Sequence, residues 1–303
     1  MIVTVTLNPA LDLTYGIDAL VPHGTHRVST VAERPGGKGL NVARVLHALG
    51  EPVLATGLLG GHTGTRVASL LDTAGVPTSF LPVSGETRRT VAVVDGTDAT
   101  GFWEPGPVIP PGEWSRFGAH FRDLLPRASV VALCGSLPPG LPDDAYASLI
   151  HLATAAGVRT VLDTSGPPLR HGLRASPTIT KPNTTELAEL VASSDASPSL
   201  IRGLTTGAVV VSRGPDGLLA VTPDGVRSCA PPAALEGNPT GAGDACVAAL
   251  ARGLRDGTRW PELLADAVAL SAAAVASPAA GEIDPEVYHR TLMALGAHSG
   301  ATT

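Results

Sequence analysis

The second half of the chain alternates short buried strands with apolar runs of helix length, and this alternation restricts the fold more than any other feature. The strand-like segments are residues 129–133, 159–163, 178–180 and 208–212. The apolar helical runs between and after them are residues 145–156, 184–191 and 260–276. Single strands separated by helices form βαβ units, in which parallel strands lie between two helical layers. The pattern therefore predicts an α/β protein with three αβα layers and a mostly parallel central sheet.

Two stretches in the first third of the chain do not follow this alternation. Residues 11–34 and 79–105 contain strand-like pieces and lack a helical period. Strands with no helix between them suit a small sheet of their own. We therefore expect 11–34 and 79–105 to form a β-sheet lid. Residues 1–10, 35–78 and 106–303 would then form the main nucleotide- and substrate-binding domain.

Composition excludes several classes of partner. The net charge is −6 and no basic run exceeds two residues, so we expect no nucleic-acid partner. No apolar run is long enough for a membrane span, and the first residues alternate like a strand rather than a signal peptide. The three cysteines have no metal-binding spacing, which favours reduced thiols. These features predict a cytoplasmic protein with no membrane partner.

Residues 238–245, Asn-Pro-Thr-Gly-Ala-Gly-Asp-Ala, place two glycines and an acid just before an apolar run of helix length. Glycines at a helix start let backbone N–H groups converge on one point, where the helix dipole also favours an anion. Asp244 beside such a phosphate cradle could accept the proton of an attacking hydroxyl. A simple helix cap is the competing interpretation, and this stretch alone leaves both open.

Two further stretches carry cations. In Gly36-Gly37-Lys38-Gly39-Leu40-Asn41, the Asn41 amide suits sugar hydroxyls and Lys38 suits an anionic substituent, although a tight turn would explain the glycines equally well. The spacing is not that of a Walker A loop. Arg88 and Arg89 are adjacent in a lid strand, so they face opposite sides and at most one points into a cleft. A guanidinium there could bind phosphate through two bonds.

Three stretches that follow predicted strands have both a structural and a functional interpretation. Asn183 and Glu186 could form a reciprocal helix cap or hold a hydrated Mg²⁺. Residues 212–217 could turn a hairpin or line a nucleotide pocket. Asp12 is an ordinary surface acid unless the end of the first strand borders the site. The histidines lack metal spacing and no serine-hydrolase elbow occurs.

Together these motifs resemble the ribokinase-like (PfkB) family of carbohydrate kinases, over essentially the whole chain. Residues 238–244 match the family's C-terminal signature and residues 36–41 its N-terminal signature, with 181–186 between them. Residues 7–12, 35–44 and 135–140 resemble its hexose-phosphate branch, which includes 1-phosphofructokinases, tagatose-6-phosphate kinases and a minor 6-phosphofructokinase. The resemblance implies a ribokinase-like fold.

The resemblance also implies a role for each motif residue. Asp244 would be the catalytic base, and the anion hole would be formed by the amides of Gly241, Ala242 and Gly243. The sugar would be held by Asp12, Gly37 and Asn41, and its existing phosphate by Lys38 and Arg88. ATP would contact Lys181, Ser212 and Gly214. Magnesium would be held, through water, by Asn183 and Glu186.

The expected activity is ATP- and Mg²⁺-dependent phosphorylation of a ketohexose monophosphate, foremost fructose 1-phosphate, to give fructose 1,6-bisphosphate. Tagatose 6-phosphate, an unphosphorylated sugar or nucleoside, and a non-catalytic sugar-phosphate sensor remain alternatives. Gly101-Phe102-Trp103 departs from the polar residues that relatives often carry in the lid, which leaves the exact sugar open. The apolar Phe102 and Trp103 favour a homodimer that pairs through the lid.

Overall fold

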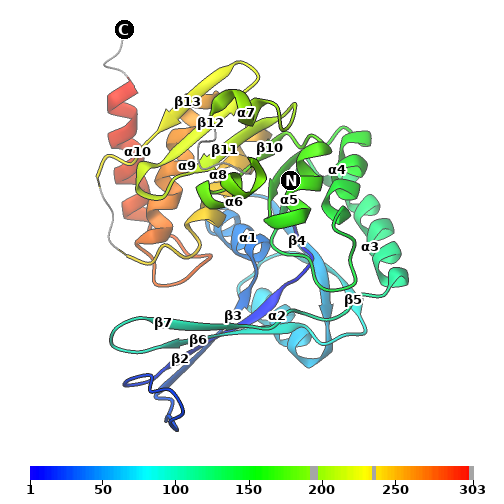
Figure 1. Ribbon diagram of the computed structural model, residues 1–303, viewed down its shortest axis with the longest axis vertical. Coiled ribbons are helices and arrows are strands. Elements are labelled where there is room, and N and C mark those ends of the chain that lie inside the picture. Colours follow the sequence, from blue (N-terminus) through cyan, green and yellow to red (C-terminus); the bar gives the residue numbers. More distant parts are fainter. Residues whose placement is uncertain (192–196, 234–236, 300–303) are drawn as a thin grey trace.

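A sheet of short, mostly buried strands forms the centre of the main body in the computed structural model, which describes residues 1–191, 197–233 and 237–299 (Figure 1). The sheet has nine strands within this part of the chain, in the order β13-β12-β11-β10-β9-β8-β1-β4-β5. Their bounds are β1 (Ile2–Thr6), β4 (Val53–Gly60), β5 (Thr78–Val83), β8 (Val130–Cys134), β9 (Arg159–Asp163), β10 (Ile179–Thr180), β11 (Ala208–Ser212), β12 (Leu218–Thr222) and β13 (Gly225–Cys229). The pairings from β5 to β11 are parallel, so these strands present their carboxyl ends at one edge.

Helices cover both faces of this sheet, because successive strand residues point to opposite sides. Along β8, Val130 and Ala132 belong to one apolar core, and Val131 and Leu133 belong to the other. The first core is closed by α1 (Lys38–Ala48), α2 (Gly61–Thr73), α8 (Ala242–Asp256), α9 (Trp260–Val275) and α10 (Pro285–Ser299). The second is closed by α3 (Pro111–Leu124), α4 (Ala145–Ala155), α5 (Gly166–Arg174), α6 (Thr184–Val191) and α7 (Pro198–Arg202). The predicted three-layer arrangement is confirmed.

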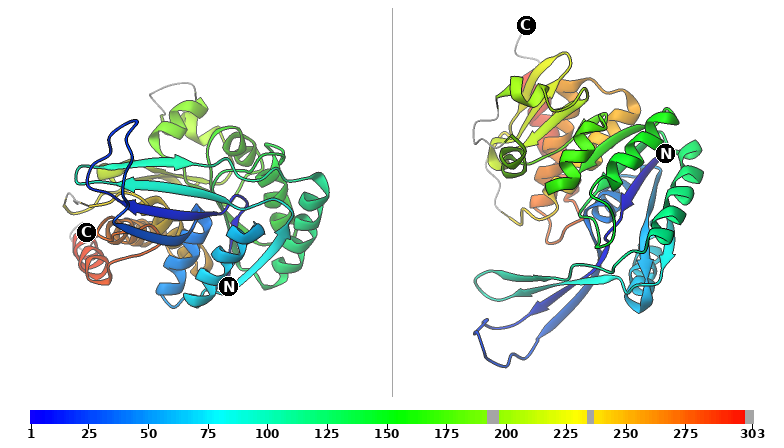
Figure 2. Two further views of the ribbon diagram at one scale, coloured as in Figure 1. Left: turned by 90° about the horizontal axis from the view of Figure 1, so that it is seen from below. Right: turned by 45° about the vertical axis from the view of Figure 1, so that its right-hand side comes forward.

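A second sheet projects from the carboxyl edge of the main sheet and forms the lid (Figures 1 and 2). Its order is β3-β2-β6-β7, from β2 (Ala10–Gly16), β3 (Thr30–Gly36), β6 (Arg88–Val94) and β7 (Ala99–Trp103). The predicted assignment of residues 79–83 to this lid is wrong. These residues lie in β5, which pairs with β4 at the edge of the main sheet. The alternation of a strand does not reveal which sheet will accept it.

The far edge of the main sheet adds two antiparallel strands that the sequence analysis did not separate. β12 pairs back onto β11, and β13 onto β12. A 3-10 turn, Gly214–Asp216, connects β11 to β12, and a second such turn, Leu125–Arg127, follows α3. The hairpin interpretation of residues 212–217 is therefore confirmed.

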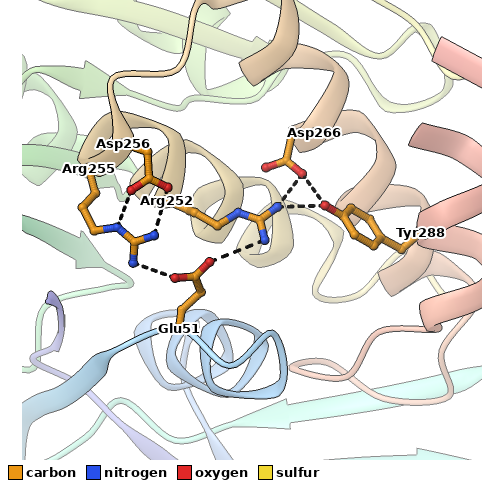
Figure 3. Close-up of polar contacts among 6 residues, drawn as sticks. All are labelled: Glu51, Arg252, Arg255, Asp256, Asp266 and Tyr288. Carbon is orange, nitrogen blue, oxygen red and sulfur yellow. Dashed lines mark hydrogen bonds and ion pairs between the residues drawn. The ribbon is translucent and has the colours of Figure 1, made fainter. Parts of the chain in front are cut away.

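Partly buried charges connect the helices of the first layer (Figure 3). Arg252 of α8 contacts Asp266 of α9 at 2.6 Å and donates to the Tyr288 hydroxyl of α10 at 2.9 Å. Glu51, just after α1, contacts Arg252 at 3.7 Å and Arg255 at 2.6 Å. Because these side chains are only 15 to 20% exposed, except for Tyr288, whose residue is 8% exposed, removal of one partner leaves a desolvated charge.

We expect Arg252→Met to lower the free energy of unfolding by about 2 kcal/mol, because Asp266 and Glu51 lose their shared cation inside the helix layer. Urea denaturation measures the change. The matched control is Arg259→Met, which removes an 81% exposed arginine that pairs with Glu262 one helical turn away. Equal losses in the two variants would contradict a stabilising role for the buried cluster.

Candidate active site

A cavity of about 550 Å³ lies where the carboxyl ends of the main strands meet the lid. Both the body and the lid contribute predicted site residues to its wall: Asp12, Gly37, Lys38, Asn41, Arg88, Lys181, Asn183, Glu186, Ser212, Gly241, Gly243 and Asp244. The two remaining predicted residues, Ala242 and Gly214, line a second cavity of about 550 Å³. The two cavities adjoin, because they share Asn183, Ser212 and Gly243 in their walls. The structure thus brings the predicted residues together, while their roles stay predictions.

The start of α8 supplies the predicted anion hole. Gly241 is the N-cap with φ of 90°, a conformation that a residue with a side chain rarely adopts. A Cβ atom at this position would also lie 2.8 Å from the Ala280 Cα, so the backbone approach requires glycine. The Ala242 N–H donates to the Pro239 carbonyl at 3.2 Å, so this predicted anion-hole amide has a partner within the chain.

Asp244 lies in the first turn of α8 and is buried. Its carboxylate accepts a hydrogen bond from the Asn41 side-chain amide at 2.8 Å, and no side chain caps the helix at Gly241. The competing cap interpretation is therefore not what the structure shows. Burial raises the pKa of Asp244 to about 7, and the nearby Asp163 carboxylate adds to the rise, while the bond from Asn41 opposes it.

Asp163 is the centre of a buried ion cluster that the sequence analysis missed. It ends β9 and is fully buried. Its Oδ1 lies 3.0 Å from Lys38 Nζ and 3.5 Å from Lys181 Nζ, and its Oδ2 has no hydrogen-bond partner within the described residues. Burial disfavours both ammonium ions, but the Asp163 charge outweighs it, so the pKa of each lysine lies above its ordinary value. An acid at the carboxyl end of a predicted strand was the signal that could have found it.

The two adjacent arginines of the lid, Arg88 and Arg89, point to opposite faces of the sheet, as the strand alternation predicted. Arg88 lines the cavity and donates to two backbone carbonyls at 3.1 and 3.3 Å. Arg89 instead forms an exposed ion pair with Glu104 at 2.8 Å. Asp12, opposite Thr90 in the lid, accepts a hydrogen bond from the Thr90 hydroxyl. Burial raises the pKa of Asp12, although that bond and the Arg88 charge oppose the shift.

Asn183 and Glu186 form the predicted reciprocal cap. The Glu186 N–H donates to Asn183 Oδ1 and the Asn183 N–H donates to Glu186 Oε2, each at 2.8 Å. Both residues also line the first cavity, as does Asp163. Such oxygen atoms fit Mg²⁺, which keeps several waters and takes few protein ligands. In the described ranges no three His, Cys, Asp or Glu side chains group into a metal site.

The second cavity is lined mainly by small and apolar residues. Cys246, Val268, Ala272 and Val275 come from α8 and α9, and the hairpin after β11 forms the other side. A cleft of this kind accepts a flat apolar group, with its polar end toward the shared wall and the first cavity. The two adjoining cavities therefore suit two ligands bound side by side, with the polar end of the ligand in the second cavity reaching the first cavity.

The match to a family description covers most of the chain: the profile described as "pfkB family carbohydrate kinase" matches residues 5–286. The chain belongs to the pfkB family of carbohydrate kinases. It is therefore a phosphotransferase that uses ATP. Within the part of the chain that the structure covers, no helix is both long and apolar enough to cross a membrane.

Solved structures resemble this chain over nearly its full length. Phosphofructokinase-2 from Escherichia coli in complex with fructose-6-phosphate is 29% identical, with a TM-score of 0.88, covering 97% of this chain and 99% of that one. A possible 1-phosphofructokinase from Thermotoga maritima is 26% identical, with a TM-score of 0.83 and coverage of 96% and 97%. The ribokinase of Arabidopsis thaliana, at 21% identity, TM-score 0.76 and coverage of 96% and 98%, shares the fold. The expected ribokinase-like fold and the likeness to the hexose-phosphate branch are confirmed.

The raised pKa of Asp244 predicts a specific dependence of stability on pH. Between about pH 4 and pH 7 the folded protein holds a proton that the unfolded chain has lost, so stability falls as the pH rises through this window. We expect Asp244→Asn to raise the free energy of unfolding by about 2 kcal/mol at pH 8 and to change it little at pH 4. Urea titrations at both pH values measure this. An equal change at both would contradict the raised pKa.

Proposed function

We propose that this kinase transfers the γ-phosphoryl group of ATP to a ketohexose monophosphate, foremost to the 6-hydroxyl of fructose 1-phosphate, giving fructose 1,6-bisphosphate. The observation that carries the proposal is the state of Arg88. Among the described residues it forms no ion pair, and it lines the cavity that also holds Asp244. Asp12 and Glu104 act on Arg88 only from beyond ion-pair distance among the described residues. A partly desolvated guanidinium of this kind is suited to a phosphate that arrives with the substrate.

The body side of the cavity supplies what phosphoryl transfer requires. Asp244 would accept the proton of the sugar hydroxyl as the new bond forms, and a pKa near 7 makes it a stronger base than an ordinary carboxylate. The Asn41 amide would hold the carboxylate in place for this step. The N–H groups of Gly241 and Gly243 would stabilise negative charge on the transferred group, and that of Ala242 would join them once its bond to the Pro239 carbonyl is released.

Lys38 is the second proposed ligand of the substrate's phosphate, and its ion pair with Asp163 holds it at the floor of the cavity. Asp12, Gly37 and Asn41 would bind the sugar hydroxyls from the lid and from α1. With the phosphate fixed at one end, the free hydroxyl would be held near Asp244 at the other. Positioning of this kind accounts for much of the catalysis in phosphoryl transfer.

ATP would occupy the second cavity, with its base among the apolar residues and its phosphates toward Lys181, Ser212 and Gly214. Mg²⁺ would be held through water by Asn183 and Glu186. When bound, it would neutralise phosphate charge and orient the phosphates. The polar side chains at the wall shared by the cavities support this placement.

We also infer a homodimer that pairs through the lid, in the cytoplasm. Phe102 of β7 is 58% exposed, which is unusual for an aromatic side chain on a monomer surface. Its neighbour Trp103, 75% exposed, points to the other face of the lid and lines the first cavity, so Phe102 carries this inference. A tetrameric inhibited form is described for Escherichia coli phosphofructokinase-2, so assembly of similar chains has a precedent. The three cysteines are free, as expected for a reducing compartment.

The substrate is tested by ADP release from Mg-ATP in the presence of four sugars: fructose 1-phosphate, tagatose 6-phosphate, fructose 6-phosphate and fructose. We expect the largest kcat/KM with fructose 1-phosphate. A preference for tagatose 6-phosphate would keep the mechanism but change the substrate, because both sugars carry a phosphate and a primary hydroxyl at opposite ends. Turnover of fructose alone would contradict the phosphosugar assignment. Binding of a sugar phosphate without any turnover would indicate a sensor.

The role of Arg88 is tested by Arg88→Met, which should raise the KM for fructose 1-phosphate roughly 50-fold because the phosphate loses a charge-assisted pair of hydrogen bonds. Arg89→Met is the matched control, since the neighbouring side chain faces away from the cavity and pairs with Glu104. Its KM should stay within about threefold of the parent value. Similar KM values for the two variants would show that Arg88 does not hold the phosphate.

A further inference from the structure

The short segment between α9 and α10, residues 280–282, contacts both the lid and the main body. Its Glu282 carboxylate oxygen Oε1 lies 3.3 Å from Arg34 Nε of lid strand β3. The same oxygen lies 3.4 Å from Arg44 Nη2 of α1. Arg44 also donates from Nη1 to the Ala280 carbonyl at 2.9 Å. One carboxylate therefore joins a lid strand to a helix of the body.

The same segment supports the anion hole from behind. A Cβ atom on Gly241, the N-cap of α8, would lie 2.8 Å from the Ala280 Cα, so the two backbones are in direct contact. Gly281 has φ of 77°, and a Cβ atom there would lie 2.7 Å from Arg44 Nη1 and 3.1 Å from Asn41 Oδ1. The segment thus fits closely between α1 and the first residues of α8.

Arg34, the lid residue that contacts Glu282, lies next to the proposed sugar site. In the antiparallel pairing of β2 with β3, Arg34 is directly opposite Asp12. Arg44 also lies close enough to Asp12 for its charge to lower the pKa of that carboxylate. A continuous path of contacts therefore leads from Asp12 through Arg34, Glu282 and Arg44 to the backbone beneath Gly241.

We propose that Arg44 and Glu282 are positioning residues that couple the seating of lid strand β3 to the geometry of the anion hole and Asp244. This inference rests on the proposed function, because it assigns these residues to the kinase reaction. Arg44 fixes the Ala280–Gly281 backbone, and Glu282 transmits the position of β3 to Arg44. Neither residue lines the cavity that holds Asp244. Their effect is therefore on the placement of the reacting groups.

A merely structural role predicts a different result. Arg34 and Glu282 each have side chains that are 37% exposed, and ion pairs of such groups contribute little to stability. The loss of either should then leave turnover unchanged. Under the proposal, Arg34→Met, Glu282→Gln and Arg44→Met each lower kcat roughly tenfold, while the KM for ATP changes less than about threefold.

The control is Arg252→Met, which removes a cation of similar burial from α8, the helix that carries Asp244. Arg252 lies about two helical turns further along α8, where it pairs with Glu51 and Asp266 (Figure 3), and it lines neither of the two site cavities. This variant should lower the melting temperature at least as much as Arg44→Met and leave kcat within about twofold. The double variant Arg34→Met/Glu282→Gln should lose no more kcat than Glu282→Gln alone, because the loss of Glu282 already breaks the contact with Arg34. Losses that multiply, or a kcat that follows melting temperature in all variants, would overturn the proposal.

A second readout does not depend on which sugar is the substrate. Hydrogen exchange of the peptide 238–245 should be faster in Arg44→Met than in the parent protein and unchanged in Arg252→Met, because only the first variant releases the backbone beneath Gly241. If the parent turns over none of the sugars, the proposed function fails while this measurement still tests the coupling. Equal exchange in the parent and Arg44→Met would overturn the coupling even if the kinase assay succeeds.

Discussion

The site depends on the ion pairs that the buried Asp163 carboxylate forms with Lys38 and Lys181. Without an anion between them the two ammonium groups would repel each other, and Lys181, whose side chain is only 4% exposed, would also be left desolvated. Asp163 has no access to water of its own, so it would be equally unfavourable without the lysines. The three charges therefore stabilise one another, and they keep two cations beside the helix end where a phosphoryl group would pass. Lys181 Nζ lies only 3.5 Å from where a Cβ on Gly243 would be.

The same cluster sets the basicity of Asp244. Burial and the Asp163 charge raise its pKa, whereas Asn41, Lys38 and Lys181 lower it. A helix N-terminus alone would favour the ionised form and make the carboxylate a weak base. The value near 7 is thus a property of the whole cavity.

Much of the architecture and of the site could be predicted because the responsible signals are local. Strand–helix alternation predicted the layers, and glycine-rich motifs at helix starts predicted Gly241, Asn41 and Asp244. The sequence could not predict which sheet β5 joins, because the alternation of its side chains between two faces would be the same whether it paired with β4 or with the lid. Asp163 carries no motif, and its importance comes from two lysines that are distant in sequence. The role proposed for residues 280–282 likewise depends on contacts with three separate elements.

A kinase must also prevent water from accepting the phosphoryl group. The proposed connection between the lid and the anion hole would help to meet this requirement. If the first amides of α8 were fully ordered before the sugar was seated, ATP and water alone would occupy a competent site. Asp12 is a proposed sugar ligand, and its partner in the sheet, Arg34, contacts Glu282. Seating of the sugar against β2 would then reach Gly241 through Glu282, Arg44 and the Ala280 backbone. Under this arrangement the reacting geometry is completed by the substrate itself, and hydrolysis is disfavoured without a separate gate.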